Sequence, residues 1–213
     1  TAYAMSEAAA SRTRFCGFLA PRPPQRSVEQ VRAELELGGR RLIAVSPGGG
    51  GDGGPLLRAF LAGLRDRIDD SLLAYVVEGP LLPEEERAAV RAQAEALPNV
   101  RLAPFDVDYA AVVRAADAVV SMGGYNSVVE AVSFGKRPVV VPRLPGALEQ
   151  QLRAEGFARL GLAHLVKPDT LSQATLWAAI DAELAQETPP SRQLDLDGVP
   201  VIASALAQLS LAV

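Results

Sequence analysis

The residues best suited to chemistry in this chain lie in the segment that ends at Glu130, where two glycines precede polar side chains and a carboxylate. Gly123 and Gly124 let the backbone approach a ligand closely, and Asn126 and Ser127 are expected to open a helix whose free N–H groups attract an anion. Glu130 would lie about one and a half turns into that helix, where it could accept hydrogen bonds from a diol such as a ribose. The segment therefore predicts a nucleotide site. The plain alternative is a simple turn followed by a solvated glutamate.

A second glycine-rich stretch, residues 48–54, directly follows an apolar run and precedes Pro55. Its position between a strand and a helix favours a flexible loop at the ligand edge, and the alternative is a connection without a ligand. No Lys-Ser or Lys-Thr pair follows the glycines, so the stretch is not a Walker A loop. A Gly-x-Gly-x-x-Gly match within a run of glycines carries little weight as a dinucleotide signal.

Polar residues also follow the last apolar run of the central region. Glu149 suits the start of a helix, whereas the amides of Gln150 and Gln151 can both donate to and accept from sugar hydroxyls, and the pattern alone leaves both interpretations open. Arg143 could offset phosphate charge, but with 21 basic residues in the chain a surface role is the favoured interpretation.

Composition excludes several classes of protein. Of 213 residues, 49% are apolar and 22% charged, and a net charge of −4 argues against a polyanion-binding surface, so we expect no nucleic acid partner. Cys16 and His164 are each the sole residue of their type, which leaves no internal disulfide and no Cys/His metal site. No Ser-His-Asp set can be assembled from the motifs, and His164 is expected to be structural. No apolar run reaches the roughly 18 residues of a transmembrane helix. A single thiol suits the reducing cytoplasm.

The elements that must position these residues alternate regularly from residue 41 onwards. Several strand-like runs are apolar throughout, which indicates burial on both faces of a sheet. Repetition of strand and helix predicts an α/β fold, a doubly wound and mostly parallel Rossmann-like sheet with ligands at the carboxyl ends of its strands. The predicted strands are 42–45, 72–77, 100–102, 118–120 and 138–141, and the predicted helices are 28–37, 56–67, 83–97, 109–115, 127–134, 147–155, 171–184 and 201–211.

In this order the features resemble the C-terminal, donor-binding half of a GT-B glycosyltransferase. They are most similar to the glycosyltransferase family 28 C-terminal domain, the family that includes the peptidoglycan UDP-N-acetylglucosaminyl transferase. The resemblance covers residues 41–185 and is most specific over 118–151, with a strand, a two-glycine turn, a helix with a glutamate, a strand that ends in proline, and a Gln-Gln pair. Two features depart from the family pattern. Met122-Gly123 stands where the family often has Arg or another polar residue and Ser, and the first loop is richer in glycine.

The resemblance implies a role for each site residue. A loop with backbone groups would hold the uracil edge, the glycines and the helix start would hold the diphosphate, one carboxylate would hold the ribose, and the Gln-Gln pair would contact the sugar. The implied ligands are Gly49, Gly50, Gly123, Gly124, Asn126 and Ser127 for the diphosphate, Glu130 for the ribose, Phe105 and Asp106 for the base, and Glu149, Gln150 and Gln151 for the sugar.

The same resemblance implies the activity. A hexosyl group would pass from a UDP-sugar, or a similar nucleotide-sugar, to an unidentified acceptor by displacement with inversion, without a required metal or other cofactor. The family's catalytic base and acceptor site belong to an N-terminal domain, and the chain begins at Thr1 rather than Met, so we expect a piece of a longer protein that is inactive alone. The predicted organisation is an interdomain linker over 1–40, a nucleotide-sugar-binding domain over 41–190 and a closing helix within 191–213. The expected location is cytoplasmic, peripheral to the inner face of the membrane in the full-length protein.

Two alternatives stay open at this point. UDP-N-acetylglucosamine 2-epimerases share the architecture, although the chain lacks the acidic and basic catalytic residues expected of them. A non-catalytic donor-binding subunit, recruited by a membrane partner, is the second alternative.

Overall fold

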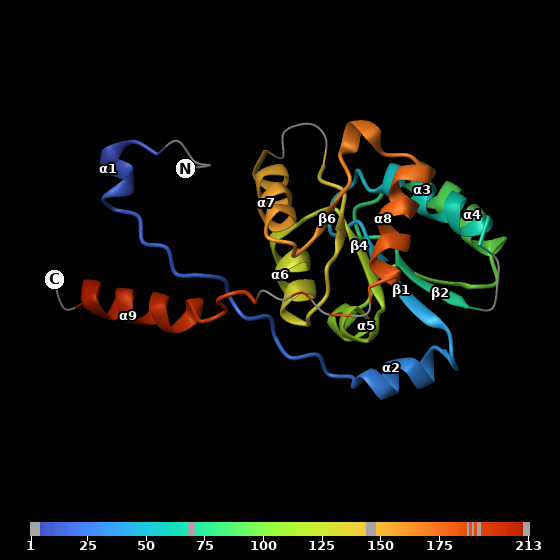
Figure 1. The fold of residues 1–213 in the computed structure, drawn as a ribbon, viewed down its shortest axis with the longest axis horizontal. Helices are drawn as coiled ribbons and strands as arrows, with labels where there is room; N and C mark the ends of the chain where they lie inside the picture. The colour runs from blue at the N-terminus through green and yellow to red at the C-terminus, as the bar shows by residue number, and fades with distance from the viewer. Residues whose placement is uncertain are drawn as a thin grey trace.

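The computed structural model describes residues 5–67, 71–143, 148–186, 188, 190 and 193–210, and Figure 1 shows an α/β body with the two terminal segments beside it. Six strands of the described chain form one parallel sheet in the order β3-β2-β1-β4-β5-β6. The order reverses between β1 and β4, and such a reversal opens a crevice at the carboxyl ends of the two strands. The predicted fold class is confirmed. The strands are β1 (Arg41–Ser46), β2 (Leu72–Val77), β3 (Val100–Ala103), β4 (Ala118–Ser121), β5 (Val139–Val140) and β6 (His164–Leu165).

Helices cover both faces of the sheet (Figure 1). Because side chains alternate along a strand, Ile43 and Val45 face one helical layer while Leu42 and Ala44 face the other. The first layer consists of α3 (Gly54–Arg65), α4 (Glu84–Glu95) and α8 (Gln173–Leu184), and the second of α2 (Val28–Glu34), α5 (Tyr109–Ala115), α6 (Tyr125–Ser133) and α7 (Leu148–Arg159). A short 3-10 helix, η1 (Pro168–Thr170), precedes α8.

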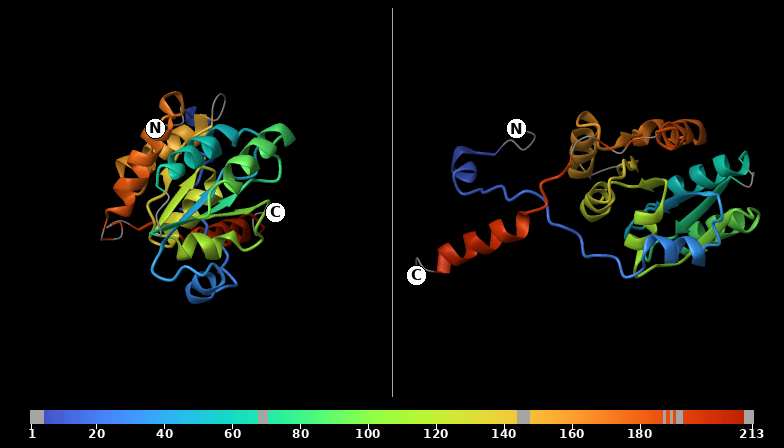
Figure 2. Two further views of the ribbon diagram at one scale, coloured as in Figure 1. Left: turned by 90° about the vertical axis from the view of Figure 1, so that its right-hand side faces the viewer. Right: turned by 60° about the horizontal axis from the view of Figure 1, so that its bottom comes forward.

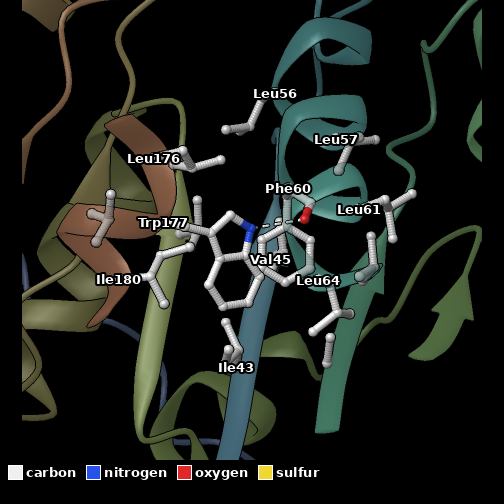
Figure 3. Close-up of a cluster of buried hydrophobic side chains, with 14 of the residues drawn as sticks. Ile43, Val45, Leu56, Leu57, Phe60, Leu61, Leu64, Leu176, Trp177 and Ile180 are labelled. Atoms are coloured by element: carbon white, nitrogen blue, oxygen red, sulfur yellow. Dashed lines mark hydrogen bonds between the residues drawn. The ribbon is translucent and has the colours of Figure 1, made fainter. Parts of the chain in front are cut away.

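Trp177 joins α8 to α3 at the centre of the first layer (Figure 3). Its ring stacks on Phe60 with the centroids 5.2 Å apart, and its Nε1 donates to the Phe60 carbonyl oxygen at 2.9 Å. The indole is fully buried and its one polar group is satisfied, so it adds apolar burial without an unpaired donor. This contact fixes the helix that follows β6 against the helix that follows β1.

Two features of the fold differ from the predicted organisation. Ser27 caps α2 through a capping box with Gln30, and Val31 of that helix is fully buried against the sheet, so the α/β body begins ahead of residue 41. The second difference is β6, which is absent from the predicted strands. Two residues are too short to give a periodic signal, and β6 is defined by its pairing with β5, from Val139 with His164 to Val140 with Leu165.

The terminal segments lie together on one side of the body (Figures 1 and 2). An isolated antiparallel bridge between Leu19 and Asp197 joins them, next to α9 (Gly198–Ser210), while α1 (Glu7–Ala10) lies further towards the N-terminus. α9 leads away from the sheet layers with exposed apolar side chains such as Val199 and Leu209. A C-terminal helix is therefore present, but its closing role stays a prediction. No helix in the described part of the chain has the length and apolar character needed to cross a bilayer.

Candidate functional site

The two glycine-containing turns start side by side at the carboxyl edge of the sheet. Ser46 at the end of β1 pairs in register with Ser121 at the end of β4. Each serine then stabilises its own turn, because the hydroxyl of Ser46 accepts from Gly48 N at 3.1 Å and that of Ser121 accepts from Gly123 N at 3.4 Å. Gly48 and Gly123 both adopt positive φ, +76° and +77°, a region that favours glycine. Two similar turns thus flank the crevice at the reversal of strand order.

The second turn leads directly into α6, whose N-terminus faces this crevice. Gly124 is the N-cap, and within the described residues no side chain caps the first turn of the helix. The free N–H groups and the positive end of the helix dipole make such a terminus suited to an anion. The helix start expected from the sequence is therefore present at this edge, and anion binding there stays a prediction.

A cavity of about 220 Å³ lies between the two turns. This volume is below the roughly 300–1,000 Å³ of sites that enclose a whole drug-sized ligand, so it suits part of a nucleotide-sugar, such as its diphosphate. Of the predicted diphosphate ligands, four line the cavity directly, while Gly123 lies buried behind it and Gly50 lies under the guanidinium of Arg143. The lining residues are Pro47, Gly48, Gly49, Met122, Gly124, Tyr125, Asn126, Ser127, Arg143 and Gln150.

Glu130 lies one turn beyond the cavity on the same side of α6 as Ser127, because residues three apart on a helix are neighbours. Burial, and next the negative charge of Asp108, raise the pKa of Glu130 above its usual value. The hydrogen bonds found among the described residues include none to the Glu130 carboxylate. A half-buried carboxylate without such a partner is well placed to accept from a ligand hydroxyl.

The predicted base-binding loop follows β3 and leads to Asp108, the residue whose negative charge acts on Glu130. Phe105 is 60% exposed there, which leaves its ring available for stacking. The Asp106 carboxylate is already used, since Tyr75 Oη donates to it at 2.9 Å and Arg26 Nη2 at 2.9 Å. Asp106 therefore holds the loop in shape, and a base would be held by the loop's backbone and by Phe105. The roles of the cavity, Glu130 and Phe105 as diphosphate, ribose and base ligands stay predictions.

The three predicted sugar ligands lie in different environments. Gln150 lines the cavity, and its Oε1 accepts from the backbone N–H of Arg143 at 3.3 Å. Gln151 lines a separate cavity of about 270 Å³ and donates to Glu155 at 2.9 Å. Glu149 forms an ion pair with Arg153 one turn later. The structure thus brings Gln150 alone of the three to the glycine turns.

Among the lining residues, two with polar side chains were not predicted as ligands. Tyr125, the first residue of α6, accepts from the backbone N–H of Leu19 at 3.1 Å and stacks against Phe18, so the N-terminal segment reaches the site through it. Arg143 was interpreted as a surface residue, yet its side chain is only 25% exposed and lines the cavity. Its position just after β5, at the carboxyl edge, is the signal that could have identified it.

A larger cavity, about 490 Å³, lies beside β3 and α4 and is a poorer candidate. Its buried carboxylate, Glu78, is only 1% exposed and accepts from Arg87 at 2.9 Å and from Arg91 at 2.7 Å. The Glu78 carboxylate is therefore already neutralised by these two arginines. The lining of this cavity includes Pro104 of the base-binding loop but no residue of the glycine turns or of α6.

The parallel sheet and its glycine-lined edge define a Rossmann-like domain of the GT-B glycosyltransferase type. The sequence profile of the glycosyltransferase family 28 C-terminal domain matches residues 76–199, more than half of the chain, and the chain belongs to this family. It is 34% identical over 123 residues to the UDP-N-acetylglucosamine--N-acetylmuramyl-(pentapeptide) pyrophosphoryl-undecaprenol N-acetylglucosamine transferase of Rhodopseudomonas palustris (strain HaA2), a match that covers 57% of this chain and 31% of that protein. The matched part of the chain thus spans about a third of the length of this relative.

Solved structures show the same fold. The glycotransferase of kitacinnamycin superposes with a TM-score of 0.58 at 22% identity, covering 81% of this chain and 41% of that one. A putative UDP-N-acetylglucosamine 2-epimerase from Listeria monocytogenes gives a TM-score of 0.57 at 19% identity, covering 85% and 48%. At these identities the likeness concerns the fold alone. The family expected from the residues around Glu130 is therefore confirmed by the profile match, independently of these structures.

Proposed function

We propose that this chain is the donor-binding part of a glycosyltransferase that transfers a hexosyl group from UDP-sugar to an acceptor. The observation that carries the proposal is the glycine-lined cavity at the start of α6, with Glu130 one turn further along that helix and an exposed Phe105 in the loop after β3. These three groups would suit the diphosphate, the ribose and the base of a nucleoside diphosphate, respectively. Family membership supports a transferase rather than an epimerase.

In the proposed reaction the acceptor oxygen attacks the anomeric carbon, and the bond from that carbon to the donor diphosphate breaks. The electron pair leaves with the nucleoside diphosphate, whose growing charge the N–H groups at the start of α6 would stabilise. The acceptor's proton must go to a base outside the described site. His164, the single histidine, lies at β6, where its Nε2 is 3.0 Å from Glu183, and is not part of the cavity.

In this proposal, an N-terminal acceptor domain or a partner subunit supplies this base. A cytoplasmic location, peripheral to the membrane in the full-length protein, and turnover without a required metal are parts of the same proposal. Chelation with EDTA would then leave the activity of the full-length enzyme unchanged, whereas loss of activity that Mg²⁺ or Mn²⁺ restores would contradict metal independence.

Calorimetric titration of the chain with UDP tests donor binding. Glu130→Gln keeps the shape of the side chain but removes its charge, and we expect it to weaken UDP binding by about 10- to 100-fold, as the loss of a hydrogen bond to a charged group implies. The matched control is Glu85→Gln, at an exposed position of α4, which should leave UDP affinity unchanged.

A second titration, with 2′,3′-dideoxyuridine diphosphate, assigns the effect to the ribose. Because this nucleotide lacks the two hydroxyls, Glu130→Gln should lower its affinity far less than it lowers the affinity for UDP. No binding of UDP at millimolar concentration to well-folded protein would contradict the proposal, and equal losses for the two nucleotides would contradict the role of Glu130.

A further inference from the structure

Arg143 is the one formally charged residue among those that line the glycine-turn cavity in the described structure. Its backbone follows β5 and Pro142, and its side chain extends across the crevice to the first glycine loop. There Nη2 donates to the Pro47 carbonyl oxygen at 3.4 Å, and the guanidinium lies over Gly50 so closely that a side chain at that position would overlap it. The arginine thus spans both walls of the cavity.

The contacts that hold this guanidinium are long and partly exposed. Its ion pair with Asp52 measures 3.3 Å between Nη1 and Oδ1, and the Asp52 side chain is 42% exposed. Ion pairs with this exposure contribute little to stability, because solvent competes for both partners. A ligand with greater negative charge at the same place would therefore replace Asp52 at small cost.

A diphosphate is such a ligand. The remaining lining groups are neutral, so the start of α6 offers only partial positive charge to a leaving group that carries at least two negative charges. A guanidinium supplies a full charge and a planar pair of donors that fits phosphate oxygens, and it keeps that charge at any pH of interest.

We propose that Arg143 binds the donor diphosphate opposite the start of α6, and that the Arg143 guanidinium forms its ion pair with Asp52 when no donor is bound. Binding exchanges the carboxylate for phosphate and frees the loop that carries Gly50 and Asp52 from its tie to β5. This inference rests on the proposed donor-binding function and names the cationic ligand of the same site.

Titrations of the whole chain with UDP, by calorimetry, and with uridine, by ligand-observed NMR, test the exchange. Arg143→Gln should weaken UDP binding by about 10- to 100-fold while uridine affinity stays within about twofold, because only UDP carries the phosphates. Arg143→Lys keeps the positive charge but loses the planar pair of donors, so it should weaken UDP binding by an intermediate amount. Arg159→Gln, at the exposed end of α7, is the matched control and should bind UDP as the unaltered chain does.

Asp52→Asn gives the second, opposite readout. Removing the competing carboxylate should tighten UDP binding by about 2- to 5-fold, and this gain should vanish when Arg143→Gln is also present. If UDP binds the unaltered chain but Arg143→Gln leaves its affinity unchanged, or lowers UDP and uridine affinity equally, the exchange is refuted while the proposed function stands. If neither UDP nor uridine binds the unaltered chain, the proposed function falls and this inference falls with it.

Discussion

Gly123→Ala is expected to destabilise the protein strongly, whereas the same change at the adjacent Gly124 is not. Gly123 has a φ of +77°, and a Cβ built there would lie 2.8 Å from Cγ1 of Val140, which is fully buried. Gly124 has a φ of −56°, and its Cβ would meet only Ser127 Oγ at 3.7 Å, an ordinary contact. Both glycines belong to the predicted diphosphate cradle, so the pair separates backbone requirement from ligand contact.

The magnitude for Gly123 follows from two terms. Left-handed backbone costs an L-residue about 1–2 kcal/mol, and overpacking a rigid core costs about 1–3 kcal/mol, which together give about 2–5 kcal/mol. At about 2–4 °C per kcal/mol for a protein of this size, the melting temperature should fall by about 4–20 °C. For Gly124→Ala the free energy of unfolding should change by less than about 1 kcal/mol.

Urea unfolding followed by circular dichroism measures both changes, and a double variant divides the larger one. Because Val140→Ala removes the atom that the new Cβ would meet, it should recover about 1 kcal/mol or more of coupling energy from Gly123→Ala, while the backbone cost remains. A Gly123→Ala protein as stable as the Gly124→Ala protein would refute the reasoning. So would a coupling energy near zero between Gly123→Ala and Val140→Ala, if Gly123→Ala alone still loses the full expected stability.

Three further predictions concern the scaffold around the site. Trp177→Ala should cost about 3–5 kcal/mol by urea unfolding, because it empties the space beside Phe60 and removes the indole hydrogen bond to that carbonyl; a loss below about 1 kcal/mol would contradict this packing. Burial, and next the hydrogen bond to Asp106, raise the pKa of Tyr75 from 10.0 to about 12. The stability that neutral Tyr75 contributes is therefore complete below pH 10 and lost as the pH rises towards 12; Tyr75→Phe should abolish that part of the alkaline loss, and an unchanged pH profile would contradict the assignment. Arg26→Gln should lower stability by about 1–3 kcal/mol and speed amide exchange in the loop of Asp106, and unaltered exchange there would show that the arginine does not hold the loop.

The sheet could be predicted because its central strands are apolar along most of their length and alternate with segments of helical length. The central strands β1, β2 and β4 leave this signal, since each is buried on both faces. β6 left none, because its two residues, His164 and Leu165, become a strand only through pairing with β5. The placement of α9 away from the sheet depends on contacts of the terminal segments, such as Leu19 with Asp197, that no local pattern encodes.

The backbone of the candidate site could be predicted from the sequence, whereas its side-chain pairings could not. Gly123 and the start of α6 follow from a two-glycine turn after a buried strand. The pairing of Arg143 with Asp52, and the use of Asp106 by Tyr75, join residues distant in sequence through long side chains, so spacing could not reveal them.

The location of UDP on the folded chain tests the central claim most directly. Amide chemical shifts of the isotopically labelled protein, followed during a UDP titration, should move around the two glycine turns, the first turn of α6 and the loop of Phe105. Changes confined instead to the larger cavity around Glu78, or no changes at millimolar UDP, would contradict a donor site at the start of α6.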